Sequence, residues 1–360
     1  MVSRASFVAL ITACSLSATA GAATLSGSLF RPPSLRTTAS SPRTACPSST
    51  VFLRLFGEIR GYPMGASGAT KPCTDITGPN TLLLGNGNGY GEMQVGRDGY
   101  LHTTAFQSNG PGGLLIFKPN ANGNAAPWRA VSVDQDHVAL ATDPKRTDYV
   151  VASQGYAFDN CWYVVPHGAT MPSLSNCDTQ VQAIYALAAD KRGELYAIGF
   201  DVANNELRVD VFRHPSSPSP TLVRTIEGSS TGFPTNSGSY FNCTFALATD
   251  PLKATLYTYF GGPVCPPTVE EFGAQSSGNV KPARTITGSL TELPAMAFAA
   301  NVMTVAQNGD LYVSTQTPSI LVFGPHGHGN VKPNRVITDP SAPSQSTAVG
   351  IAVRPTTVSP

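Results

Sequence analysis

The sequence has few charged residues. Asp, Glu, Lys and Arg make up 12% of its 360 residues, against about 25% in typical soluble proteins. The net charge is +1 and no run of Lys or Arg occurs, so the electrostatic footprint that a phosphate backbone or an anionic membrane surface would need is missing. We therefore expect no nucleic-acid partner.

Common catalytic and metal-binding motifs are also missing. Neither G-x-x-x-x-G-K-[ST] nor H-E-x-x-H occurs, which removes the nucleotide-binding and zincin signals. The cysteines lack the C-x-x-C spacing and the nearby histidines that a zinc site would need. We expect no metal and no cofactor.

A long hydrophobic segment is absent as well, and the N-terminus predicts export instead. Residues 1–23 have one positive charge, an apolar run from Ala5 to Ala13 and then small residues. That run is far shorter than the ~20 residues that span a bilayer, so we expect a secretory signal and no transmembrane span. Two endings fit: cleavage after Ala20 or Ala23, or lipidation of Cys14, because Ile11 to Cys14 resembles a relaxed bacterial lipobox.

Residues 24–48 are rich in Ser, Thr, Pro and Arg and predict a flexible tether. The mature protein would then be secreted, or exported to the cell surface or periplasm, either soluble or lipid-anchored. The cysteines agree with this location. Apart from Cys14 there are six, and their local spacing favours three structural disulfides in an oxidising compartment. The expected pairs are Cys46 with Cys73, Cys161 with Cys177, and Cys243 with Cys265.

One sequence pattern recurs along the chain. Ile320–Thr338 reads ILVFGPHGHGNVKPNRVIT and aligns without a gap to Val269–Thr287, VEEFGAQSSGNVKPARTIT. Self-similarity at roughly 40–50 residues indicates stacked supersecondary units, of which β-propeller blades are the all-β kind. Further copies start at Ile59, Leu114 and Val209, and a degenerate copy spans Cys161–Cys177.

A second pattern, strand–turn–strand, precedes the copies, as in IYALAADKRGELYAIGF from Ile184. Three aspartates, Asp143, Asp190 and Asp250, precede such turns. A metal site is one interpretation of them. Because they recur with the turn in separate repeats, we expect each carboxylate to cap backbone amides of its own turn.

Together the two patterns predict an all-β fold, a six-bladed β-propeller with four-stranded blades over residues 49–356. Residues 51–62 supply strands of a blade that lacks its innermost strand, and Ala348–Pro355 has the pattern of such a strand with nothing after it. Pairing of the C-terminal strand with the N-terminal blade would close the ring and remove the open edges. We expect a monomer.

The turns DKRGELYA (Asp190–Ala197) and AQNGDLYV (Ala306–Val313), with the repeated I-x-V-F…G-N…P-x-R-x-I pattern, resemble six-bladed propellers of the NHL and YVTN type, particularly secreted bacterial ones. The resemblance covers about residues 50–355. It implies the fold and leaves the activity open, because this architecture carries lyases, lactonases, sugar dehydrogenases and binding scaffolds.

Tyr90, Glu92 and His137 are the candidate site residues. They are exceptions in two columns of otherwise small or apolar residues on the innermost strands, and a His near a carboxylate can serve as acid and base near neutral pH. The alternative is that these side chains are merely solvated or hydrogen-bonded. His326 and His328, in the Gly-rich loop GPHGHGN, could take a transition metal but fit tolerated loop variation better.

Two functions follow. The first is a binding or scaffold module for an extracellular or periplasmic ligand or protein, held at one face of the propeller. The alternative is a hydrolase or lyase, lactonase-like or virginiamycin B lyase-like, with its site at the mouth of the central channel. Calcium-dependent lactonases of this fold gather several acidic and amide ligands at the axis. In the two columns of this sequence only Glu92 is a residue of that kind.

Overall fold

The structure is a computed structural model, and it describes residues 46–83, 91–105, 113–133, 136–154, 157–201, 203–204, 206–234, 243–295, 302–342 and 348–354. These residues belong to one compact unit, Arg43–Pro360. The predicted export signal, the tether up to residue 45, Cys14 and Tyr90 lie outside the described residues. The proposed boundaries of these segments stay a prediction.

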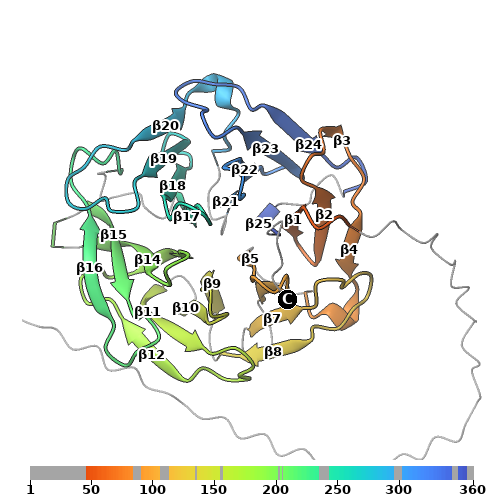
Figure 1. The fold of residues 1–360 in the computed structure, drawn as a ribbon, viewed down its shortest axis with the longest axis horizontal. Coiled ribbons are helices and arrows are strands. Elements are labelled where there is room, and N and C mark those ends of the chain that lie inside the picture. Colours follow the sequence, from red (N-terminus) through yellow and green to blue (C-terminus); the bar gives the residue numbers. More distant parts are fainter. Residues whose placement is uncertain are drawn as a thin grey trace, which may run out of the picture. The chain divides into compact units, whose positions relative to one another are not determined.

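Six sheets stand around a common centre, and each is one blade of four antiparallel strands, to which blade 6 adds a short parallel strand (Figure 1). The strands of a blade are called a to d, from the innermost outward. Blade 1 consists of β25 (Ala348–Val353), β1 (Thr50–Leu55), β2 (Glu58–Pro63) and β4 (Thr74–Thr77). Blade 2 consists of β5 (Met93–Val95), β6 (Leu101–Ala105), β7 (Gly113–Phe117) and β8 (Arg129–Ser132). Blade 3 consists of β9 (Asp136–Thr142), β10 (Asp148–Gln154), β11 (Ala157–Val165) and β12 (Leu174–Cys177).

The remaining blades follow in chain order. Blade 4 consists of β13 (Ile184–Ala189), β14 (Leu195–Asp201), β15 (Glu206–Arg213) and β16 (Thr221–Ile226). Blade 5 consists of β17 (Thr244–Thr249), β18 (Leu256–Gly261), β19 (Thr268–Phe272) and β20 (Arg284–Thr287). Blade 6 consists of β21 (Met303–Val305), β22 (Leu311–Ser314), β23 (Ser319–Phe323) and β24 (Arg335–Thr338), with β3 (Gly68–Ala69) as a fifth strand. The predicted all-β, six-bladed propeller is confirmed.

The ring closes as the sequence predicted. β1 pairs with β2 on one side and with the C-terminal β25 on the other, so that Leu53 lies opposite both Arg60 and Ile351. The end of β25 reaches further: the Arg354 guanidinium lies 4.9 Å from the centre of the Phe52 ring, and Nη2 donates to the Pro119 carbonyl of blade 2 at 2.5 Å. The C-terminal strand therefore joins blade 1 and also contacts blade 2.

The inner strands are buried on both faces. Every residue of β6 and β7 is buried, and β17 is buried up to its last residue. A blade packs between two neighbours, so both of its faces meet apolar side chains and a strict apolar/polar alternation is not needed. The core clusters accordingly mix residues from adjacent blades, as where Ile198 of blade 4 and Phe245 of blade 5 belong to one cluster.

The glycine of the repeated Gly-Asn motif joins blades 2, 5 and 6 to the blade before each of them. Gly123 donates its N–H to Asp75 O at 2.7 Å and accepts from Thr77 N–H at 3.0 Å. Gly278 and Gly329 form matching parallel bridges to strand d of blades 4 and 5. All three glycines have φ between 62° and 70°, in the left-handed region that costs other residues energy, which explains why the motif keeps glycine.

The Asn after this glycine also binds the preceding blade, through a hydrogen bond to the segment after its strand d. Asn124 Oδ1 accepts the N–H of Asn80 at 2.7 Å, and Asn330 Oδ1 accepts that of Leu290 at 2.7 Å. Both acceptors hold the start of a short 3-10 helix, η1 (Pro79–Thr81) or η3 (Ser289–Thr291). None of the helices in the described residues is long and apolar enough to cross a membrane.

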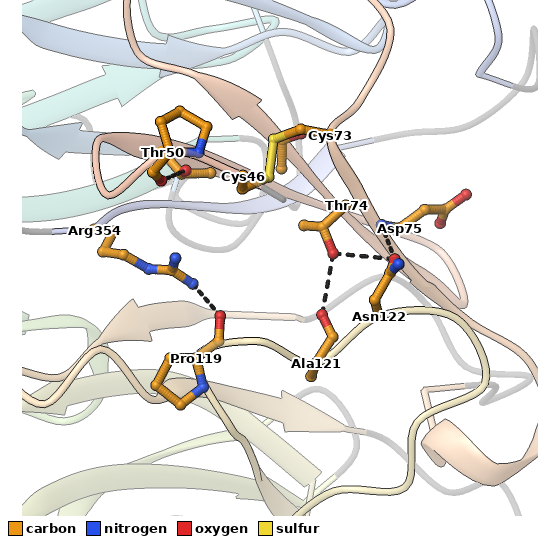
Figure 2. The surroundings of a disulfide bond; sticks show 11 residues. Cys46, Thr50, Cys73, Thr74, Asp75, Pro119, Ala121, Asn122 and Arg354 are labelled. Atoms are coloured by element: carbon orange, nitrogen blue, oxygen red, sulfur yellow. Dashed lines mark hydrogen bonds between the residues drawn. A yellow bond between two sulfur atoms is a disulfide. The ribbon is translucent and has the colours of Figure 1, made fainter. Parts of the chain in front are cut away.

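The three predicted disulfides are present, with Cα–Cα distances of 5.1 Å for Cys46–Cys73, 3.9 Å for Cys161–Cys177 and 5.8 Å for Cys243–Cys265. Figure 2 shows the first of them beside the junction of blades 1 and 2, where Thr74 Oγ1 donates to Ala121 O at 3.0 Å. This disulfide ties the segment before β1 to the start of β4, so it supports the blade in which the ring closes.

Candidate functional site

A hollow of about 140 Å³ lies where the six innermost strands end, and all six blades line it. We call it the axial hollow and the side of the ring on which it lies the turn face, because the turns between strands a and b surround it. One residue from each blade represents its wall: Val353, Gln94, Thr142, Ala189, Thr249 and Thr304. Several of these residues also line a smaller hollow of about 60 Å³.

The hydroxyl and amide groups of the wall are partly used by the protein. Thr142 Oγ1 donates to Asp148 Oδ1 at 2.7 Å, and Thr249 Oγ1 donates to Ala189 O at 2.7 Å. A threonine hydroxyl has one proton and two lone pairs, so these oxygens remain able to accept hydrogen bonds from a guest. The wall thus offers neutral polar groups fixed by their contacts to neighbouring strands.

The turn aspartates cap their own turns, as predicted. Asp143 Oδ1 accepts the N–H groups of Lys145 at 2.8 Å and Thr147 at 2.9 Å. Asp190 and Asp250 do the same with the amides of Arg192, Glu194, Leu252 and Lys253. The carboxylates are therefore occupied, and within the described part of the chain no group of three or more His, Cys, Asp or Glu residues could hold a metal ion.

Two cationic residues stand in the wall of the axial hollow. Arg97 and Lys191 line it from the turns of blades 2 and 4, and both are exposed. Lys191 Nζ also contacts the carbonyl of Leu252. Asp143 and Asp190 also line the hollow and keep their negative charge, but their oxygens accept hydrogen bonds from turn amides, from the Tyr149 hydroxyl and from Arg192. The exposed side chains of Arg97 and Lys191 are the charged groups that can turn towards a guest, which favours a polar guest with an acidic group.

A buried ionic cluster supports the wall between blades 2 and 3. His102 Nδ1 lies 2.9 Å from Asp148 Oδ1 and Arg129 Nη2 lies 4.0 Å from Asp148 Oδ2, and all three residues are at most 7% exposed. Asp148 also accepts the Thr142 hydroxyl. His102 Nε2 is buried and His102 is not among the residues that line the hollow, so we assign the cluster the role of positioning Thr142.

The candidate residues from the sequence lie towards the other end of the strands. The Glu92 carboxylate is 1% exposed and accepts the N–H of Leu140, and the Glu92 N–H donates to Thr104 Oγ1 at 3.0 Å. His137 lies in β9 opposite Ala152, but its side chain, like Tyr90, is outside the described residues. Their role as a site stays a prediction.

Two other motifs have loop positions. His326 and His328 are exposed in the loop between β23 and β24, where they fit the interpretation as loop variation. Gly228–Gly232 reads GSSTG and matches G-x-S-x-G, but it follows strand d, and its Ser230 N–H donates to Asn279 Oδ1 at 2.6 Å. The strand–turn–helix context that a nucleophile elbow needs is not found there.

The sequence did not predict the axial hollow, because the alignment columns that contain Glu92 and His137 lie at the other end of the innermost strands. Gln94 and Thr304 share one column of the repeat alignment, and Thr142 and Thr249 share the next. Both columns lie a few residues after the columns of His137 and Glu92, further along strand a. Their polar residues among small ones were the available signal.

No protein-family model matches the chain, and no curated protein sequence matches it. Solved structures do match. The β-propeller domain of Cps50 (Swd1) from Myceliophteria thermophila has 9% identity and a TM-score of 0.38, and the match covers 64% of each chain. Hydrazine synthase from Kuenenia stuttgartiensis has 12% identity and a TM-score of 0.39, covering 73% of this chain and 80% of that one. Apo AztD from Citrobacter koseri has 12% identity and a TM-score of 0.35, covering 84% and 73%. At such low similarity these structures carry no functional argument, and the NHL and YVTN resemblance stays a prediction.

Proposed function

We propose that this protein is an exported β-propeller whose function is binding, and that it holds a small polar or acidic group of its ligand in the axial hollow. One observation carries the proposal: a hollow built by all six blades presents fixed hydroxyl and amide groups with Arg97 and Lys191 in its wall. Ligand sites are concave and use a few placed polar groups for specificity. The three disulfides support an oxidising compartment.

Export is tested by the mass of the mature chain. We expect expression in a bacterial host to yield a periplasmic or secreted protein that begins at Gly21 or Thr24, or a membrane-bound one that begins at a lipidated Cys14. Intact-mass spectrometry separates the three forms. A full-length chain that retains Met1 in the cytoplasm would contradict export.

The binding site is tested by a pair of charge-removing substitutions. Thermal shift assays of the mature chain against carboxylic acids, phosphate esters and oligosaccharides should find ligands that raise Tm. In the double variant Arg97→Gln, Lys191→Gln we expect the dissociation constant for such a ligand to rise about tenfold or more, since a hydrogen bond to a charged group contributes roughly 1.5–3 kcal/mol. Lys253→Gln, an exposed turn lysine of blade 5 outside the hollow, is the matched control and should bind normally.

The opposite result would move the site. If every ligand keeps its affinity in the double variant and loses it in Glu92→Gln, the ligand binds at the other end of the channel. The enzymatic alternative around Glu92, His137 and Tyr90 would then lead, with turnover of the ligand as the next measurement.

A further inference from the structure

Trp128 is an exposed aromatic residue that the fold does not require. It is 44% exposed and precedes β8 on the turn face, where the corresponding positions of blades 5 and 6 have Ala283 and Asn334. Its ring is nevertheless held in place: Tyr100 lies 5.0 Å away, edge to face at 61°, and the Arg129 guanidinium lies 5.4 Å from the ring centre. The result is a rigid, flat apolar surface open to solvent.

Arg129 behaves differently from the arginines at the same repeat position. Arg284 donates to Pro325 O at 2.8 Å and Arg335 donates to Met64 O at 2.6 Å, so both clasp the loop of the following blade. The three guanidinium nitrogens of Arg129 are buried and have no hydrogen-bond partner among the described residues. Asp148 is 4.0 Å away and is shared with His102. Arg129 therefore places a buried positive charge against the indole, where water screens it little.

Further positive charge surrounds this aromatic pair. Arg97, Lys145 and Arg146 are exposed on the neighbouring turns of blades 2 and 3, and Asp98 balances one of them through a 3.4 Å contact with Arg146. Burial and the charge of Arg146 lower the pKa of His167, on the adjoining loop of blade 3. We call Trp128, Tyr100, Arg97, Lys145 and Arg146 the aromatic corner. It has three cations, against Asp98 and the turn-capping Asp143 on the same two turns.

The aromatic corner is continuous with the axial hollow. Arg97 belongs to both, and Pro144, which precedes Lys145, also lines the hollow. A ligand that covers Trp128 can therefore extend past Arg97 towards Thr142 and Gln94. Such a path combines an apolar platform, cations and neutral hydrogen-bonding groups in that order.

We propose that the aromatic corner binds a carboxylated oligosaccharide, with one sugar ring stacked on Trp128, its carboxylates beside Arg97 and Arg146, and the next sugar hydroxyls in the axial hollow. Sugar rings have apolar C–H faces that cover aromatic rings, and carboxylates pair with guanidinium groups. A single-stranded nucleic acid could also stack on Trp128, but it would need a longer basic track than this corner offers. The proposal rests on the proposed function and names its ligand class.

The test uses the tryptophan itself, because the chain has two tryptophans and the other, Trp162, is fully buried. Tetragalacturonate is titrated into the mature wild-type protein, followed by tryptophan fluorescence and calorimetry. We expect a shift of the emission to shorter wavelength and saturable binding that weakens with added salt. Trp128→Ala should weaken binding at least tenfold with an unchanged Tm, and Trp128→Tyr should recover part of it. Leu252→Ala, which removes an exposed apolar residue of another turn on the same face, should have no effect.

Maltotetraose is a neutral chain of similar size. It should bind the wild type more weakly than tetragalacturonate does. The double variant Arg97→Gln, Arg146→Gln should bind the two sugars equally. The proposal is overturned if tetragalacturonate does not bind, if Trp128→Ala binds it normally, or if an oligonucleotide binds more tightly than the sugar. Failure of this proposal is distinct from failure of the proposed function. In the first case other ligands still depend on Arg97 and Lys191, whereas in the second no ligand does.

Discussion

Removing residues 348–360 should abolish the stable monomer. The deletion takes away β25, whose Ala348, Ile351 and Ala352 are at most 2% exposed, and exposes the paired edge of β1. It also removes Arg354 and its contacts to Phe52 and Pro119. Burial of these side chains contributes roughly 4–8 kcal/mol at about 25 cal/mol per Å², which is comparable to the total stability of a typical domain. Circular dichroism melts and size-exclusion chromatography should show an unfolded or aggregated chain.

The control is a chain that ends at Arg354 and lacks only residues 355–360, which should melt like the full chain. A synthetic peptide with the sequence of residues 348–354 should partly restore the long deletion, because the exposed edge of β1 can accept a strand in trans. A soluble monomer without residues 348–360 and with an unchanged Tm would refute closure of the ring by β25.

Glu270 predicts an unusual dependence of stability on pH. This residue is 3% exposed in β19, and its Oε2 is buried without a hydrogen-bond partner in the described residues. It lies opposite Thr258 in the sheet, and a Cβ added to Gly232 would meet Oε1. Burial raises the pKa of Glu270 to about 8, so the side chain is protonated in the folded protein under conditions that ionise it in the unfolded chain.

The sign follows from linkage. A raised folded-state pKa means that stability is fully present below the unfolded pKa, about 4.3, and is lost as pH rises to about 8. We expect Glu270→Gln to raise the free energy of unfolding by roughly 2–4 kcal/mol at pH 8 and to change it little near pH 4. Urea denaturation at a series of pH values measures both. Burial and the charge of Asp210 raise the pKa of Asp178 to about 7. The Glu270→Gln variant should therefore keep some pH dependence of stability, smaller than that of the wild type.

The neighbouring residue supplies the control. The Glu271 carboxylate is partly exposed and pairs with Arg284 at 2.5 Å, so Glu271→Gln should bring no gain in stability between pH 5 and pH 8. Equal pH profiles for the wild type and Glu270→Gln would show that Glu270 is hydrated or paired, and would contradict the burial of its carboxyl group in blade 5.

Much of the fold could be predicted because each blade repeats the same local chemistry. Turn aspartates such as Asp143 cap amides within five residues, and strand d repeats as RVIT or RTIT, so single copies explain one another. The closing strand could be found because Ala348–Val353 has the pattern of strand a without any following strands. The disulfides were predictable because each joins cysteines close in sequence.

Contacts between blades were harder to predict. The repeated Gly-Asn motif suggests only a turn, but Gly123 bonds to Asp75 of the preceding blade. Arg129 and Arg284 occupy the same position in a P-x-R pattern, and one packs against Trp128 whereas the other reaches the next blade. A pattern within one repeat does not specify which neighbour fills the space beside it.

The site was the least predictable part. Glu92 attracted attention as a carboxylate in a column of small residues, but its carboxylate is buried against Leu140 N–H. The axial hollow depends on residues that are unremarkable singly, such as Thr142, Thr249 and Gln94. These residues line one hollow only because six strands end at the same place, and only the three-dimensional structure shows that they do.

Hydrogen exchange at the two ends of the central strands would show at which end of the channel the ligand binds. The mature chain would be compared with and without the ligand that raises its Tm most. If the ligand binds on the turn face, exchange should slow in residues 94–97, 142–145, 189–192 and 304–307, with little change in residues 91–92 and 136–139. Protection confined to residues 91–92 and 136–139 would place the ligand at the opposite end and contradict binding in the axial hollow.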